Sequence, residues 1–172
     1  MQAAKDSFYM ALRDRLAALN PSRTMVVDGV TLPAIVVREN MEPQFTEART
    51  EAFYVDWGEV QIAESTRPIL GLDCYVWYAS EGSGGAGIDR GRALAQMDEE
   101  LLRICTPPHT GLRDYSQSPT ASLGSSIFWT MPDLAKAPGE APITKVQRSA
   151  GAARLTRYAH LKVYFFLAEV GA

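Results

Sequence analysis

The sequence predicts an α+β fold: a mixed, mainly antiparallel sheet with two helices packed on one face and long mobile loops. Two segments, 4–19 and 89–104, repeat apolar residues at helical spacing. Several others alternate apolar and polar residues or carry a two-residue turn signal, as strands do. At 172 residues the chain is long enough for one domain with a substantial core, and short for two.

The N-terminal part predicts a helix followed by a hairpin. Phe8, Leu12 and Leu16 recur at helical spacing within 4–19, and Asn20-Pro21 ends the helix because proline disfavours helical geometry in the residue before it. Asp28-Gly29 then joins two valine-rich arms, which is typical of a type I′ turn. Pro33 interrupts the return arm, and we expect "AIVVRE" to resume it.

Two strand regions follow a polar loop at 40–51, which we expect to be mobile. The first, 52–64, has Gly58 as a possible bulge. The second, 70–80, is the clearest strand of the chain and has apolar residues on both faces. We therefore expect it to be central in the sheet and covered by a helix on one side. One face carries Leu72, Cys74, Val76 and Tyr78, and the other carries Asp73, Tyr75 and Trp77.

The second helix is predicted from Asp89, as its N-cap, to Ile104, before Pro107-Pro108. Leu94, Met97, Leu101 and Ile104 form its apolar stripe. The acidic run 98–100 is expected to be its solvated face.

The C-terminal part predicts an irregular, insert-like segment at about 106–153 and then a long central strand. Within the irregular segment, 125–131 reads as a strand and 143–149 as a weaker one. The polar connection between them, 132–142, is long for a compact domain. Residues 154–170 alternate clearly and predict the long strand.

The bulk composition argues against several classes of function. A net charge of −3 does not favour general nucleic-acid binding, and the basic residues near the C-terminus, Arg148 and Arg154 among them, are expected on a solvated strand surface. No segment is long and apolar enough to cross a bilayer, so we expect a soluble cytoplasmic protein. The two cysteines read as buried residues, and His109 and His160 read as structural or surface residues.

The glycine-rich segment 82–87 is the most suggestive local motif. Gly82, Gly84 and Gly87 fit the G-x-G-x-x-G spacing between a strand and a helix, and Gly85 adds a fourth glycine. A dinucleotide site also needs a parallel strand after the helix and an acidic residue about twenty positions on, where this chain has "CTPPHTG". We therefore interpret the segment as a mobile connection and expect no cofactor. A nucleotide-binding enzyme that uses this loop remains an alternative.

The order of elements resembles the phage tail terminator (tail completion or head–tail joining) family over roughly residues 4–168. The matching pieces are the "FYMALRDRLAALNP" helix, the "YVWYAS" strand with its flexible loop and the "RALAQMDEELLRI" helix. The resemblance implies a structural virion protein and not an enzyme. Such a protein forms a hexameric ring that caps the head-proximal end of the tail tube, stops its polymerisation and joins it to the head connector. It would act in the virion tail, and in the host cytoplasm during assembly.

On this reading the partners are copies of the chain itself, the tail tube protein and the head connector protein, with DNA only as cargo through the lumen and no membrane. Another intracellular oligomeric adaptor domain is a further alternative. The segments 40–51, 82–87 and 133–142 are predicted to order at ring or tube contacts. The predicted contact residues are Gly82, Gly84, Gly85, Gly87, Glu42, Glu47, Tyr75, Trp77, Arg148 and Arg154.

Overall fold

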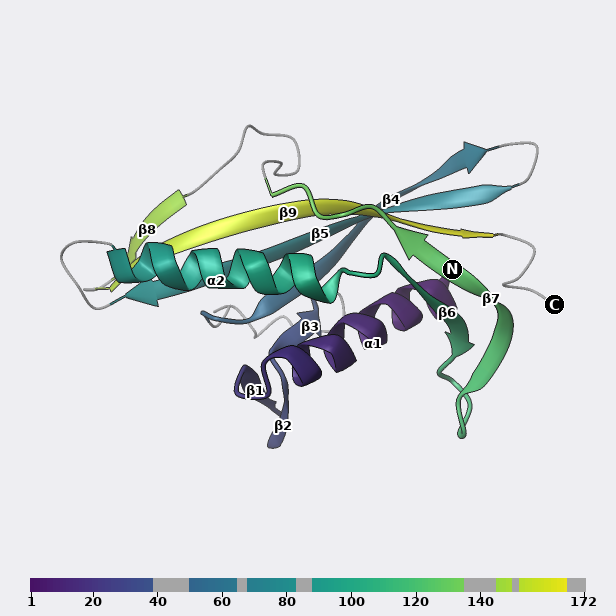
Figure 1. Cartoon of the computed structure of the whole chain (residues 1–172), viewed down its shortest axis with the longest axis horizontal. Coiled ribbons are helices and arrows are strands. Elements are labelled where there is room, and N and C mark those ends of the chain that lie inside the picture. The colour runs from purple at the N-terminus through teal and green to yellow at the C-terminus, as the bar shows by residue number, and fades with distance from the viewer. Residues whose placement is uncertain (39–49, 65–67, 83–87, 135–144, 150–151, 167–172) are drawn as a thin grey trace.

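The structure is a computed structural model that describes residues 1–38, 50–64, 68–82, 88–134, 145–149 and 152–166. These residues form two helices and nine strands, and the predicted α+β class is confirmed (Figure 1). None of the helices is long and apolar enough to span a membrane. In chain order the elements are α1 (Gln2–Leu19), β1 (Thr24–Val27), β2 (Val30–Pro33), β3 (Ile35–Val37), β4 (Phe53–Glu64), β5 (Ile69–Gly82), α2 (Ile88–Ile104), β6 (His109–Asp114), β7 (Ala121–Trp129), β8 (Lys145–Ser149) and β9 (Ala152–Phe166).

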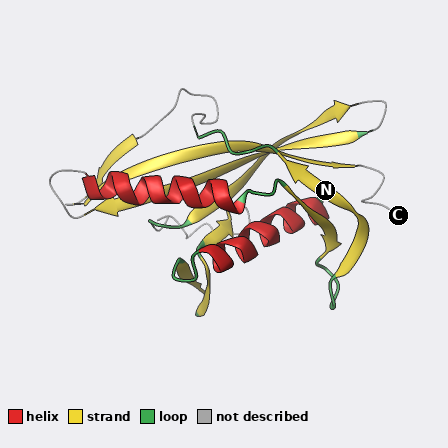
Figure 2. Cartoon of the chain, viewed as in Figure 1, coloured by secondary structure: helices red, strands yellow, loops and turns green. Residues whose placement is uncertain are grey.

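A seven-stranded mixed sheet forms the body of the protein (Figure 2). Its strand order is β3-β4-β5-β9-β7-β6, and β8 pairs with β9 beside this path. Only the β3–β4 pair is parallel; the other pairs in the sheet are antiparallel. β5 and β9 pair from Ile69↔Phe166 to Gly82↔Ala153, so the two longest strands form the centre of the sheet as predicted.

Both helices pack on one face of the sheet, where the main core lies. The predicted inward face of β5 and the predicted face of β9 are buried there, together with the apolar stripes of α1 and α2. This packing removes apolar surface from water mainly on this face, while a smaller cluster that includes Met25, Val36 and Tyr54 is buried on the other face. The core includes Phe8, Leu12, Leu16, Leu72, Cys74, Val76, Tyr78, Leu94, Met97, Leu101, Ile104, Ala159, Leu161, Val163 and Phe165.

The predicted hairpin exists, but its return arm ends earlier than expected. Asp28 and Gly29 have φ values of 49° and 79°, the left-handed geometry that a type I′ turn needs. β1 and β2 form a separate two-stranded sheet, and Pro33 ends β2. Residues 35–37 do not resume the hairpin, because β3 pairs in parallel with β4 in the main sheet.

The acidic run of α2 is not its solvated face, contrary to the prediction. Glu100 is 6% exposed and pairs with Arg23, which comes from the start of β1. Asp98 accepts hydrogen bonds from the buried Tyr78 hydroxyl and pairs with Arg157 of β9. Only Glu99 of the run is well exposed. The helix begins at Ile88, so Asp89 lies in its first turn and not at the N-cap.

The segment 106–153 contains more regular structure than predicted. β7 and β8 correspond to the two expected strands, while β6 lies where the sequence predicts irregular chain. β6 pairs with β7 along the outer side of the sheet, and this hairpin packs beside α1. The segment therefore contributes an edge of the sheet and is not an insert outside it.

Candidate functional site

Three of the predicted contact positions come together at one end of the sheet. Gly82 ends β5 opposite Ala153 of β9, and Arg148 of β8 lies opposite the same Ala153 from the other side. Arg154 is the next residue of β9 and lies opposite Glu81. The end of β5, the start of β9 and β8 thus form one three-stranded tip. Five other predicted residues, Gly84, Gly85, Gly87, Glu42 and Glu47, lie outside the described residues, as do residues 135–142.

The chain direction around the glycine segment differs from that of a dinucleotide-binding unit. β5 leads into the segment and α2 follows it, as the strand–loop–helix context predicts. The next strand, β6, runs opposite to β5, because each step along β5-β9-β7-β6 is antiparallel. A Rossmann site needs a parallel βαβ unit at this point. The topology therefore argues against the nucleotide-binding alternative.

Tyr75 and Trp77 lie on the sheet face opposite the helices, as predicted, but neither is fully exposed. Trp77 stacks on Tyr54 of β4 at 4.6 Å between ring centroids, and Tyr75 stacks on His160 of β9 at 5.0 Å. Each ring thereby covers the face of its cross-strand neighbour, which stabilises the sheet. Burial raises the pKa of the Tyr75 hydroxyl, and the nearby Asp73 carboxylate raises it further. This face is an aromatic surface with its rings already paired.

Asp73 is the polar centre of the same face. Its Oδ1 lies 2.9 Å from His160 Nε2 and 3.5 Å from Lys162 Nζ, and its side chain is 13% exposed. Lys162 also donates a hydrogen bond to Gln61 Oε1 at 3.1 Å. The cluster joins β4, β5 and β9 across their outer face. It holds a buried carboxylate between the Lys162 ammonium group and the His160 ring, and these contacts compensate its loss of hydration.

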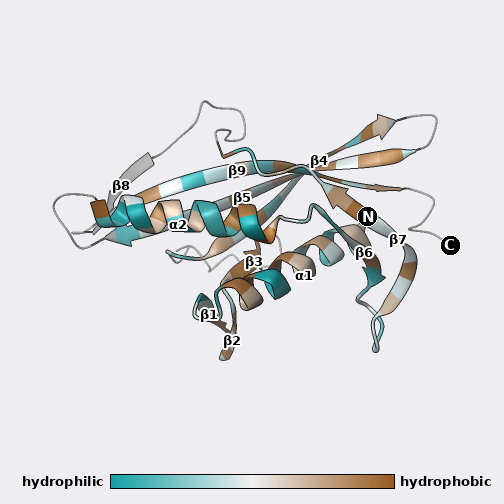
Figure 3. Cartoon of the chain, viewed as in Figure 1, coloured by the Kyte–Doolittle hydropathy of each residue, from teal (hydrophilic) through white to brown (hydrophobic). Residues whose placement is uncertain are grey.

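The outer ends of β4 and β5 project from the body (Figure 1), and the end of β9 pairs with β5 there, from Ile69↔Phe166 to Gly71↔Tyr164. We call residues 59–64 and 69–71 the β4–β5 arm. A register shift between Trp57 and Val60 marks the predicted bulge at Gly58, where the arm begins. Val60 and Ile62 are 41% and 71% exposed, and Figure 3 shows hydrophobic segments on the projecting strands. Apolar side chains at this exposure favour a contact surface.

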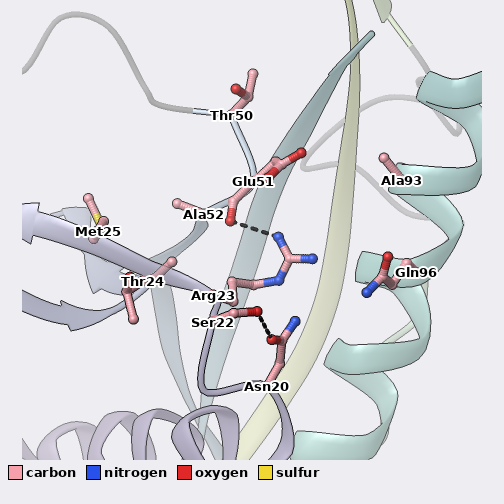
Figure 4. Close-up of a pocket in the computed structure, with 11 residues that line it drawn as sticks. Asn20, Ser22, Arg23, Thr24, Met25, Thr50, Glu51, Ala52, Ala93 and Gln96 are labelled. Atoms are coloured by element: carbon pink, nitrogen blue, oxygen red, sulfur yellow. Dashed lines mark hydrogen bonds between the residues drawn. The ribbon is translucent and has the colours of Figure 1, made fainter.

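A polar hollow of about 340 Å³ lies between β1, β4 and α2 (Figure 4). Arg23 reaches across it: the guanidinium pairs with Glu100 and donates to the Glu51 carbonyl at 3.0 Å. Asn20 also donates to Glu100, at 2.7 Å. Because these groups satisfy one another, the hollow is a junction that fixes α1, β1 and α2 together.

Burial favours the neutral forms of three core side chains, Cys74, Cys105 and Tyr78. Burial raises the pKa of Cys105 to about 12 and raises that of Cys74 as well. Burial and a hydrogen bond to Asp98 raise the pKa of Tyr78. Both cysteines are free and buried, as predicted. Within the described residues, no group of three histidine, cysteine or acidic side chains is placed to hold a metal ion.

Sequence reasoning missed the β4–β5 arm and the Asp73 cluster. A signal for the arm was present: "DWGEVQIAE" carries three acidic residues, no basic residue and alternating apolar residues after Gly58. The Asp73–His160 contact joins residues 87 apart in the chain, and no local pattern announces it. Arg23 and Glu100 are 77 residues apart in the chain, and no local pattern predicts their contact either.

No protein-family model matches this sequence, and no curated protein matches it.

Proposed function

We propose that this chain is a ring-forming structural subunit that caps the head-proximal end of a phage tail tube, stops its polymerisation and joins it to the head connector. The observation that carries the proposal is the exposure of apolar residues on strands that project from the body. Val60 and Ile62 lie on the β4–β5 arm, and Val26 and Val30 lie on the β1–β2 hairpin at 47% and 55% exposure. In Figure 1 the arm projects at the upper right of the molecule, and the hairpin projects below α1 on the lower side.

Two projections on different sides of the molecule suit a cyclic assembly better than a twofold dimer. A twofold dimer uses the same patch on both subunits, whereas a ring joins two different patches head to tail. A two-stranded ribbon such as β1–β2 is also marginally stable alone and gains from further contacts. Its attachment to the body is small: Met25, Ala34, Val36, Ala52 and Tyr54 form a second cluster. The fold thus supplies a rigid body with two outlying contact elements.

The experiment is a concentration series of the purified chain, observed by light scattering and negative-stain electron microscopy. We expect a monomer or weak oligomer in dilute solution and sixfold rings at high concentration or on tail tubes. Addition of the chain to polymerising tube protein should stop elongation at one end. An obligate tight dimer at nanomolar concentration, or tubes that elongate normally, would contradict the proposal. An adaptor of another system would bind its own partner and leave the tubes unaffected.

The glycine segment offers a prediction for the same assembly. Replacing Gly84, Gly85 and Gly87 together by alanine should leave the melting temperature nearly unchanged, because no core residue is altered. Ordering a glycine-rich segment costs about 1–2 kcal/mol of backbone entropy per residue, so it needs new contacts to repay it. We therefore expect fewer rings, and in a phage tails of abnormal length or tails that fail to join heads.

Gly91 provides the control for that substitution. It lies in α2, and an added Cβ would meet no atom within 4 Å. Gly91→Ala should keep the fold and ring formation intact. Normal rings and normal particles from the triple variant would contradict a role of the segment in assembly. Loss of folding would show instead that the glycines hold a required turn.

A further inference from the structure

Apart from β3 and β6, which end the strand order, two stretches of the sheet have an outer side with which no described strand pairs. β4 pairs with β3 only from Phe53 to Val55, so no described strand pairs with its outer side from the bulge at Gly58 to Glu64. β8 pairs with β9 along Lys145–Ser149 and with no other described strand. Open edges present unpaired backbone N–H and C=O groups, which is a template for pairing with another chain.

The two edges carry opposite charge. Beyond the bulge β4 contains Glu59 and Glu64 and no basic residue, whereas Asp56, before the bulge, pairs with Arg38. β8 contains Lys145 and Arg148 and no acidic residue, and Arg154 follows opposite it on β9. Opposite charges on two pairing strands favour their association and disfavour pairing of each edge with itself.

The edges also match in length, position and direction. β8 has five residues, and the part of β4 beyond the bulge, Val60–Glu64, has five as well. β8 lies at one end of the long axis and the projecting end of β4 at the other (Figure 1). β8 runs antiparallel to β4 within one chain, because β8–β9, β9–β5 and β5–β4 are each antiparallel. Two copies in the same orientation would therefore present an antiparallel pair.

We propose that the outer edge of β4 beyond Gly58 pairs with the outer edge of β8 of a second copy of this chain, which makes the sheet continuous from subunit to subunit. The pairing is heterologous, since it uses a different patch on each copy, and repetition can close it into a ring. This pairing rests on the proposed function, which requires that the chain forms a ring, and it specifies the contact between neighbouring subunits of that ring. Val60 and Ile62 add apolar area at the same contact.

The test is a charge exchange across the interface. Glu59→Lys with Glu64→Lys should weaken self-association at least tenfold in sedimentation velocity, and Lys145→Glu with Arg148→Glu should do the same. The fourfold variant that combines both exchanges should recover most of the association, because the charges are again opposite. Raising the salt concentration should weaken the wild-type contact.

A matched control separates this contact from a general effect of charge. Asp14→Lys with Glu99→Lys changes the net charge by the same amount at helix positions that are 70% and 62% exposed. This variant should associate as the wild type does. Melting temperatures confirm that each variant folds.

Hydrogen exchange on the wild-type chain gives a second measurement that needs no variant. Amides of Val60–Glu64 and of β8 should exchange more slowly in the assembled state than in the monomer. Rings that tolerate both charge reversals, or that leave these amides unprotected, overturn the β4–β8 pairing while the capping function stands. Rings that show the pairing but do not stop tube growth overturn the proposed function and leave the pairing in place.

Discussion

The edge formed by β6 and the edge formed by β4 beyond the end of β3 differ in how their outer backbone groups are bonded. At β6, the backbone N–H of Arg113 donates to the Ser7 hydroxyl at 2.9 Å, and that hydroxyl donates to the Arg113 carbonyl at 3.3 Å. Arg15 of the same helix donates to the His109 carbonyl at 2.9 Å. Along β4 beyond Gly58, no described side chain or strand takes this role for the outer backbone groups.

The difference shows how one fold can protect one edge and expose another. Side chains of α1 bond to backbone groups of His109 and Arg113 in β6, which disfavours the addition of a neighbour's strand at this edge. At β4 the protection stops at the bulge, where the Trp57 N–H donates to the side chain of Asp56 at 3.1 Å. Beyond it the arm keeps its edge open and its apolar side chains exposed. We infer that the β6 edge contributes to folding and the β4 edge to association.

We expect the largest loss of stability from the substitution of Phe8, the residue of α1 that contacts both β4 and β7. Phe8 is fully buried and packs edge-to-face on Trp57 of β4 and on Trp129 of β7, at 5.6 and 5.1 Å between ring centroids. Phe8→Ala should cost about 3–5 kcal/mol in the free energy of unfolding, because it leaves a cavity in the core. Urea denaturation measures the loss.

Leu19→Ala is the control, because Leu19 ends the same helix and is 38% exposed. It should change stability by about 0.5 kcal/mol or less. A loss of only about 1 kcal/mol for Phe8→Ala would show that the helix is not fixed to the sheet by this residue. The β6 edge would then lack the firm cover that the comparison assigns to it.

A smaller effect is expected from a pair of glycines, one on each edge strand. A Cβ at Gly58 would lie 2.8 Å from Tyr75 Cε2 and 3.0 Å from Asp73 Cβ, so Gly58→Ala forces a shift at the bulge. We expect a cost of about 1–3 kcal/mol, as for other overpacked sites. A Cβ at Gly111 of β6 meets nothing within 4 Å.

Gly111→Ala should therefore be neutral or stabilise the chain by about 0.4–1 kcal/mol through the unfolded state. Thermal and urea unfolding of the two variants measure the contrast. Equal effects at both positions would mean that the bulge has room for a side chain. The bulge before Val60–Glu64 would then not require a glycine at position 58.

The periodic elements were predictable from the sequence because local patterns determine them. The apolar stripes of α1 and α2, the Asp28-Gly29 turn and the two faces of β5 each follow from residue spacing. Pairing between distant segments has no such local signature. The sequence predicts that "AIVVRE" continues the hairpin, because it follows Pro33 directly. In the structure β3 pairs with β4 of the main sheet.

The candidate site was less predictable for the same reason. Tyr75 and Trp77 were correctly placed on the face without helices, but their partners Tyr54 and His160 come from other strands. The run of three acidic residues predicts a solvated Glu100, because such runs are usually exposed. In the structure Glu100 is buried and pairs with Arg23. The open edge of β4 depends on where β3 ends, and that is a property of the sheet and not of the β4 sequence.

The smallest effect, and the most direct test of the comparison, is expected from Ser7→Ala. Ser7 is 1% exposed, and its hydroxyl bonds both backbone groups of Arg113. The substitution removes one oxygen atom and leaves an N–H and a C=O at the edge of β6 without this partner. Because Arg113 is itself exposed, water can replace part of the lost bonding. We therefore expect a cost of about 1 kcal/mol in the free energy of unfolding, at the lower end for an unsatisfied polar group.

Hydrogen exchange of the Arg113 amide should accelerate in the Ser7→Ala variant, while exchange in Val60–Glu64 stays as in the wild type. Ser126→Ala, at an exposed position of β7, serves as the control and should alter neither amide set. If the Arg113 amide exchanges at the wild-type rate after Ser7 is changed, the helix side chain does not protect the edge. The difference between β6 and β4 would then arise from backbone geometry alone.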